Sequence, residues 1–225
     1  MDKIECGKCG KQYKTKKTLT KHSKICEEKA KSKENINILQ DNFTIDKYIE
    51  FINNEISTVI KKSKYNDDLL EDILLEDFIN TNAEQIKIAK KLKQIQMNVG
   101  KIWQISIGKW KDFTDLGEGD ETGLDVKSDK LKIIMEIKNR YNTDNLSSRK
   151  TNYSKLANYK KAHSDFICIY AVINDKTKEG KDEIIKCDNE DIRYLSGDKL
   201  MEYIFQDNKN QVLANLKSQM QILHV

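Results

Sequence analysis

The stretch that decides the fold is "GLDVKSDKLKIIMEIKNRYNT", residues 123–143. Its apolar residues, interrupted by a short polar run, predict two β-strands joined by a turn of Ser, Asp and Lys. The predicted strand, turn and strand are, in chain order, residues 124–127, 128–130 and 131–138. A hairpin of this kind determines which side chains of its two strands lie opposite one another.

Three charged side chains of this hairpin are expected to share one face. Glu136 and Lys138 alternate with Ile137, so they emerge side by side, and Asp125 lies across from Glu136. Two carboxylates with a lysine beside them form a hard oxygen site that suits Mg²⁺. The same groups suit phosphodiester cleavage, because the metal lowers the pKa of a bound water while the ammonium orients it. The alternative is a surface hairpin with a Glu–Lys pair worth less than about 1 kcal/mol.

The rest of the chain predicts helices on both sides of a sheet. The expected helices are residues 45–60, 69–78, 82–107 and 147–162, with one or two more in 198–223. Further strands are expected at residues 165–173 and 182–187. The third helix should bury a stripe formed by Ile88, Leu92, Ile95, Val99 and Ile102. These elements predict an α/β domain with a mixed central sheet flanked by helices.

Positive charge is concentrated at the N-terminus. Residues 1–33 contain eleven lysines and four acidic residues, so this segment carries +7 and the remainder −3 of the net +4. No run of apolar residues is long enough to span a membrane, and the N-terminus lacks the apolar core of a signal peptide. We therefore expect an intracellular, cytoplasmic protein, in which the five cysteines do not form a disulfide framework.

Four N-terminal side chains have the spacing of zinc ligands. Cys6 and Cys9 are followed by His22 and then Cys26, an order that can surround structural Zn²⁺ with four N/S ligands. Tyr13 and Leu19 supply the small apolar core. This module resembles a classical ββα zinc finger, with Cys in place of the second His. The alternative is a basic tail that contains cysteines and binds no metal.

The resemblance to a zinc finger implies a contact with nucleic acid. Its helix is expected to begin near Lys16, so that Thr15, Thr18 and Lys21 occupy the positions from which such fingers read bases. One finger spans only about 3 base pairs, so it would add affinity and positioning to a second DNA-binding region. A finger that binds protein is the alternative.

The hairpin resembles the catalytic motif of the PD-(D/E)xK nuclease superfamily. In that resemblance "GLD" supplies Asp125 and "EIK" supplies Glu136 and Lys138, with Mg²⁺ as the catalytic metal held by the two carboxylates. Members often carry a further carboxylate on the preceding helix, a few residues after a glycine. The matching position after Gly100 is Gln104, and Glu84 is a weaker substitute.

More narrowly, the chain looks like the small type II restriction endonucleases that recognise GGNCC. The similarity runs from about Tyr48 to Phe205, and "EIKNRYNTDN" is its most specific part. It implies a homodimer in a restriction–modification system that cuts both strands of duplex DNA, leaving 5′-phosphate and 3′-hydroxyl ends. The added finger suggests a chain adapted to another genome, such as that of a virus. The expected domains are a zinc finger (1–30), a linker (31–43) and a nuclease domain (44–225).

The segment after the predicted catalytic strand is strongly basic. Between Lys138 and Lys161 seven basic residues face a single acid, Asp144. Arg and Asn can make bidentate contacts to bases, whereas Lys mainly meets phosphate. The expected DNA contacts are Arg140, Asn142, Asn145, Arg149, Lys150 and Lys155. A solvated basic helix is the alternative, and for the whole chain the alternatives are a DNA-binding regulator without catalysis or a repair or junction nuclease.

Overall fold

The computed structural model describes residues 4–5, 12–13, 20, 43–62 and 76–222. The chain divides into two compact units, Met1–Lys47 and Tyr48–Val225. In the first unit β1 (Ile4–Glu5) pairs antiparallel with β2 (Gln12–Tyr13), and Thr20 is helical. A hairpin and a helix are elements that a ββα finger requires. The four predicted zinc ligands and the three predicted base-reading positions lie outside the described residues, so the finger stays a prediction.

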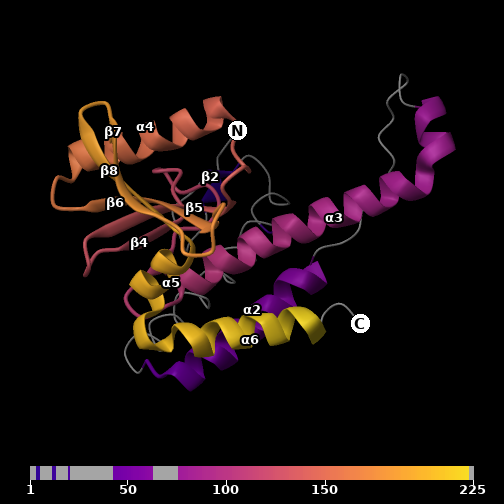
Figure 1. Cartoon of the computed structure of the whole chain (residues 1–225), viewed down its shortest axis with the longest axis horizontal. Coiled ribbons are helices and arrows are strands. Elements are labelled where there is room, and N and C mark those ends of the chain that lie inside the picture. The colour runs from indigo at the N-terminus through magenta and orange to yellow at the C-terminus, as the bar shows by residue number, and fades with distance from the viewer. Residues whose placement is uncertain (1–3, 6–11, 14–19, 21–42, 63–75, 223–225) are drawn as a thin grey trace. The chain divides into compact units, whose positions relative to one another are not determined.

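A six-stranded mixed sheet forms the centre of the second unit (Figure 1). Its strands lie in the order β3-β4-β5-β6-β8-β7. Their bounds are β3 (Thr114–Asp115), β4 (Val126–Ser128), β5 (Ile133–Arg140), β6 (Ile167–Asn174), β7 (Asp182–Cys187) and β8 (Glu190–Ser196). Strands β5, β6 and β8 run parallel, whereas β3, β4 and β7 pair antiparallel with their neighbours. The predicted α/β domain with a mixed sheet is confirmed.

Helices cover both faces of this sheet. Their bounds are α2 (Ile45–Lys62), α3 (Glu76–Gly108), α4 (Leu146–Ala162), α5 (Gly197–Phe205) and α6 (Lys209–Ile222), with the 3₁₀ turn η1 (Gln206–Asn208) before α6. Figure 1 shows α4 on one side of the sheet and α3 with α5 on the other. Among the described residues, no helix has both the length and the apolar character needed to cross a membrane.

The apolar core explains which face of β5 carries the charged residues. Ile134 belongs to a buried cluster with Leu156 of α4 and Tyr170 of β6, so it faces α4. Because side chains alternate along a strand, Glu136 and Lys138 share this face, whereas Met135 points toward the opposite one. The pattern that fills the core on the α4 side therefore also places two charged groups beside that core.

Trp110 anchors the core on the other side of the sheet. The residue is 1% exposed. Its ring makes edge contacts with Tyr48 of α2, at a centroid distance of 4.8 Å, and with Phe205 of α5, at 5.0 Å. Trp110→Ala is therefore expected to lower the free energy of unfolding by about 3–5 kcal/mol. Denaturant unfolding measures it, with the less buried Trp103 replaced by Ala as the matched control. Equal losses in the two variants would contradict this role of Trp110.

Several elements differ from the sequence-based expectations. Both strands of the hairpin begin two residues later than predicted, and strands β3 and β8 were not predicted. Helix α3 begins at Glu76 and includes Phe78, whereas the remainder of the predicted helix 69–78 lies outside the described residues. Ile88 is 61% and Leu92 54% exposed, so the predicted buried stripe is wrong in this half of α3. A helical period shows that a face is apolar, but it does not show whether anything packs on that face.

Candidate active site

Asp125 is fixed at the point where β4 begins. Its N–H donates to the carbonyl of Met135 (3.0 Å), and its carbonyl accepts from Leu116 (2.9 Å). One carboxylate oxygen, Oδ2, accepts from the backbone N–H of Ile137 at 2.7 Å. Because Val126 pairs with Met135, the next step of the antiparallel register puts Asp125 opposite Glu136. Backbone and side chain together hold this carboxylate against β5.

Glu136 carries a buried carboxylate that is only half satisfied. The residue is 5% exposed. Its Oε1 atom lies 2.7 Å from Lys138 Nζ. Its Oε2 atom is buried and has no hydrogen-bond partner within the part of the chain that the structure describes. Buried polar atoms are rarely left in this state, so the vacant Oε2 points to a ligand at this position.

The carboxyl groups of Asp125 and Glu136 repel each other in a buried environment. Burial raises the pKa of Glu136, and the negative charge of Asp125 raises it further. The pKa of Asp125 is also raised, chiefly by burial, although the hydrogen bond from Ile137 opposes this effect. Burial alone would lower the pKa of Lys138, but the surrounding carboxylates, Glu136 first, outweigh it and raise the pKa above the usual value. Lys138 therefore remains an ammonium at neutral pH.

This donor set fits a divalent cation such as Mg²⁺. Among the described residues there is no group of three or more His, Cys, Asp or Glu side chains placed to hold a metal ion. Mg²⁺ does not need such a cage, because it is usually bound by one or two carboxylates together with waters and substrate phosphates. Asp125 and the free Oε2 of Glu136 supply two adjacent carboxylates, and a bound cation would relieve their repulsion.

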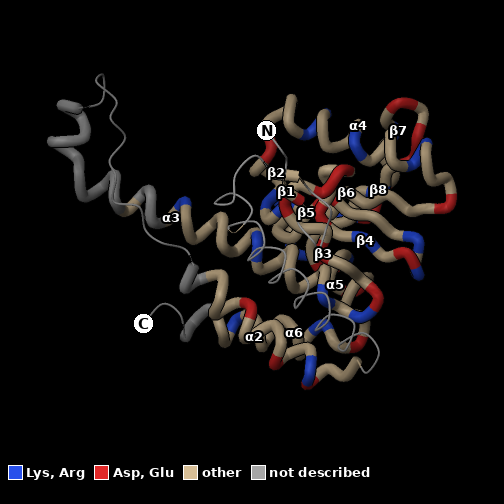
Figure 2. The backbone as a smooth tube through the Cα atoms, turned by 180° about the vertical axis from the view of Figure 1, so that it is seen from behind, with Lys and Arg blue, Asp and Glu red and all other residues tan. Residues whose placement is uncertain are grey.

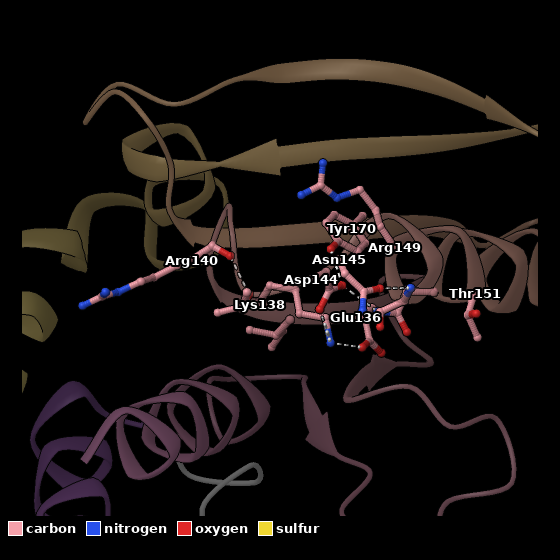
Figure 3. Close-up of polar contacts among 12 residues, drawn as sticks. Glu136, Lys138, Arg140, Asp144, Asn145, Arg149, Thr151 and Tyr170 are labelled. Atoms are coloured by element: carbon pink, nitrogen blue, oxygen red, sulfur yellow. Dashed lines mark hydrogen bonds and ion pairs between the residues drawn. The ribbon is translucent and has the colours of Figure 1, made fainter. Parts of the chain in front are cut away.

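Lys138 lies between two carboxylates (Figure 3). Besides Glu136, its Nζ lies 3.7 Å from Oδ1 of Asp144, in the loop between β5 and α4. The other oxygen of Asp144, Oδ2, accepts hydrogen bonds from the Tyr170 hydroxyl (2.8 Å) and from Nδ2 of Asn152 (2.8 Å). Asp144, Tyr170 and Asn152 were not predicted as site residues. The sequence does contain a signal for Asp144, because it is the only acidic residue in the segment 138–161, which contains seven basic residues.

Gln104 has a partner that the sequence did not reveal. Its side-chain Nε2 donates to Oδ1 of Asp115 on β3 at 2.9 Å, and its side-chain Oε1 accepts from Lys101 Nζ at 3.3 Å. Asp115 has a side chain 11% exposed and also accepts from the N–H of Gly117. Gln104 therefore holds a carboxylate from the sheet edge. Glu84 cannot substitute for it, because twenty residues of one continuous helix separate the two by about 30 Å.

The predicted DNA contacts surround the end of β5 and the start of α4. Arg140 and Asn142 are exposed, and so is Lys150. Three others have intramolecular bonds: Asn145 caps α4 by accepting from Ser148, Arg149 donates to the carbonyl of Tyr141, and Lys155 donates to the carbonyl of Gly123. Arg149 and Lys155 are half-buried, so their charges are partly committed to the protein.

A mixed sheet with an Asp, a Glu and a Lys on one hairpin is consistent with a restriction-endonuclease-like fold. The family model described as "Eco47II restriction endonuclease" matches residues 16–223, and the chain therefore belongs to this family. The match begins inside the segment predicted as the finger. The type II restriction enzyme Sau96I of Staphylococcus aureus is 33% identical over 109 residues, which cover 46% of this chain and 41% of that enzyme. The chain thus aligns with less than half the length of this curated relative, and no solved structure matches.

The repulsion between the two carboxylates predicts that removing one of them stabilises the fold. Because the pKa of each is raised in the folded protein, their ionised forms destabilise it at neutral pH, and stability increases as pH falls. Asp125→Asn keeps an acceptor for Ile137 but removes one charge. We expect its unfolding midpoint in EDTA to rise by a few degrees, as about 1 kcal/mol does in a domain of this size.

Thermal denaturation with and without divalent cation checks this expectation. The cation should raise the midpoint of the wild type more than that of Asp125→Asn. The matched control is Asp165→Asn, because the pKa of this exposed carboxyl is lowered by its hydrogen bond to Lys132, and its removal should bring no gain. A lower midpoint for Asp125→Asn in EDTA would show that the two carboxylates do not destabilise the fold.

Proposed function

We propose that this chain is a type II restriction endonuclease that hydrolyses phosphodiester bonds of double-stranded DNA with Mg²⁺. The observation that carries the proposal is the buried Oε2 atom of Glu136, which has no partner among the described residues and belongs to a carboxylate beside Asp125. Membership of the Eco47II restriction endonuclease family supports the same activity.

Asp125 and Glu136 would hold the Mg²⁺ ion. When bound there, the ion neutralises charge on the scissile phosphate and lowers the pKa of an attacking water. Lys138 is a poor general base because its raised pKa keeps it protonated. Its ammonium lies beside the carboxylate of Glu136. Its role is to donate hydrogen bonds to the attacking water or to the phosphate oxygens and to stabilise the negative charge there.

The basic segment after β5 would bring DNA to this centre. Arg140 ends the strand that carries Glu136 and Lys138, and its exposed guanidinium is free to reach a base edge or a phosphate. Asn142 is exposed in the following loop, and Asn145 retains the amide donors of its side chain after capping α4. Lys150, Arg149 and Lys155 would contact phosphate. The GGNCC sequence is proposed on the resemblance of "EIKNRYNTDN" to enzymes with that site.

Cutting both strands at such a site requires two copies of this single centre. A homodimer with two-fold symmetry meets the requirement, because a nearly palindromic sequence presents the same contacts to each protomer. The N-terminal finger is proposed to bind structural Zn²⁺ through Cys6, Cys9, His22 and Cys26 and to add DNA affinity.

Cys9→Ala tests the finger separately from the catalytic unit. We expect DNA affinity to fall by about tenfold, or about 1.4 kcal/mol, while the variant still cuts DNA at high protein concentration. Filter binding across a range of salt concentrations measures the affinity, and zinc chelation of the wild type should give the same loss. If affinity is unchanged at every salt concentration, the finger has no role in DNA binding.

Incubation of the purified chain with a mixed-sequence plasmid and Mg²⁺ tests the proposed activity. Discrete fragments that require Mg²⁺ support a restriction endonuclease, and sequencing their ends identifies the site and the cut position. A smear would indicate a non-specific or structure-selective nuclease instead. Intact plasmid that is shifted in a gel would indicate a binding protein without catalysis. Either of the last two results would overturn the proposal.

A further inference from the structure

We propose that Asp144 is a positioning residue that holds the Lys138 ammonium at a defined place beside Glu136. The inference deepens the proposed endonuclease activity and rests on it. Asp144 is the single acid in the basic segment after β5, and it turns inward, so that its side chain is 9% exposed. An acid in that segment would weaken DNA binding if it faced the phosphates, and its inward position removes this conflict.

The geometry places the ammonium between two carboxylates. Lys138 Nζ lies 2.7 Å from Oε1 of Glu136 and 3.7 Å from Oδ1 of Asp144, and its side chain is 22% exposed (Figure 3). A lysine has four rotatable bonds, so a single partner leaves it several positions. With carboxylates on two sides, the position of the ammonium is restricted, and its charge is shared between them.

Asp144 is itself held by neutral donors on two other elements. Tyr170 of β6 is 2% exposed and donates to Oδ2, as does Asn152 of α4, which is 7% exposed. The Tyr170 ring is also packed edge-on against Tyr153, with ring centroids 4.8 Å apart. Because both donors occupy Oδ2, the other oxygen, Oδ1, is left to face Lys138. The sheet and helix α4 thus fix the carboxylate that fixes the lysine.

This arrangement has a consequence for Glu136. If Asp144 were absent, the Lys138 ammonium would have only Glu136 as a close partner and would compete with a cation for that carboxylate. Sharing the ammonium between two carboxylates keeps Glu136 available while the positive charge stays near the scissile phosphate. The alternative role for Asp144 is to anchor the loop at residues 141–145, with no effect that passes through Lys138.

Two variants distinguish these roles. Tyr170→Phe removes a hydrogen bond to Asp144 without changing any charge, and Asp144→Asn removes the charge itself. The matched control is Tyr194→Phe, because Tyr194 of β8 also donates to an aspartate, Asp175, at 3.3 Å, and among the described residues the ion pairs of Lys138 are with Glu136 and Asp144, not with Asp175. Thermal denaturation establishes that each variant is folded. If Asp144→Asn does not fold, Tyr170→Phe still tests the inference.

The direct measurement is the NMR signal of the Lys138 ammonium, which is visible when the group is held and exchanges slowly with water. Lys138→Met assigns the signal by removing it. We expect the signal to broaden or vanish in Asp144→Asn and Tyr170→Phe but to persist in Tyr194→Phe. Single-turnover cleavage should fall by about 10–100-fold in the first two variants, with DNA binding in Ca²⁺ unchanged.

The outcomes separate this inference from the proposed function. If the wild type cuts DNA and both variants keep the Lys138 signal and the cleavage rate, Asp144 does not position the lysine. If binding falls in parallel with cleavage while the signal persists, Asp144 is a loop anchor and the inference is wrong. If the wild type shows no cleavage, the proposed function fails, whereas the NMR signal still reports whether Asp144 holds Lys138.

Discussion

Replacing Glu136 with glutamine is expected to slow DNA cleavage by more than about 10³-fold while leaving DNA binding in Ca²⁺ nearly unchanged. The substitution keeps the size of the side chain but removes the charge from the buried Oε2, the atom that has no partner among the described residues. A catalytic cation stabilises the transition state by several kcal/mol, and each 1.36 kcal/mol is a factor of ten in rate. Single-turnover cleavage of a labelled duplex measures the loss.

The matched control for this variant is Glu183→Gln. Glu183 is also a glutamate on a strand of the same sheet, but its side chain on β7 is 50% exposed and pairs with Lys181 at 3.5 Å on the surface. This control should cut DNA at the wild-type rate. Cleavage by Glu136→Gln at more than about a tenth of that rate would show that the catalytic centre lies elsewhere.

Lys138→Met is expected to reduce the cleavage rate by about 10²–10³-fold, the range for loss of one group that stabilises a transition state. Methionine retains the apolar part of the side chain and removes the ammonium that lies 2.7 Å from Glu136. The same change should strengthen cation binding, because a positive charge next to the two carboxylates is lost. The cleavage rate is therefore expected to fall while the affinity for Mn²⁺ rises.

Lys186→Met is the control for the lysine. Lys186 lies on β7, is 72% exposed and pairs with Asp191 on the surface, so its replacement should change neither cleavage nor Mn²⁺ affinity. If Lys138→Met weakened Mn²⁺ binding and cleavage together, the lysine would act by supporting the carboxylates, and its proposed role at the phosphate would be wrong.

The hairpin was predictable because residues close together in the sequence determine it. Alternation along the second strand and a short polar turn are enough to put Asp125 opposite Glu136, and the pairing of Val126 with Met135 agrees with this register. The starts of the two strands differ from the prediction, each by two residues. The buried strand β6 and the helix α4 were predicted on the same local grounds. Element order then favours a mixed sheet, because β5 and β6 are joined by a helix, the usual connection between parallel neighbours, and they do run parallel.

The partners of the site were not predictable, because they depend on how separate helices and strands pack against one another. Tyr170 reaches Asp144 across twenty-six residues of sequence, and Gln104 meets Asp115 only because the end of α3 approaches β3 closely. At that approach a Cβ on Gly108 would lie 2.6 Å from Asp115, so only glycine fits without a shift. The interior strand β8 likewise depends on pairing with β6 and β7, which its mixed sequence "EDIRYLS" does not signal.

If Asp125 and Glu136 bind the catalytic cation, Fe²⁺ bound in its place should reveal that position on the chain. Fe²⁺ can replace Mg²⁺ at an oxygen site, and with ascorbate and peroxide it generates radicals that break the polypeptide close to the metal. We expect fragments that end near residues 125 and 136 in the wild type and none there in a chain carrying both Asp125→Asn and Glu136→Gln. Cleavage at other positions, or the same fragments from the double variant, would show that these two carboxylates do not hold the cation.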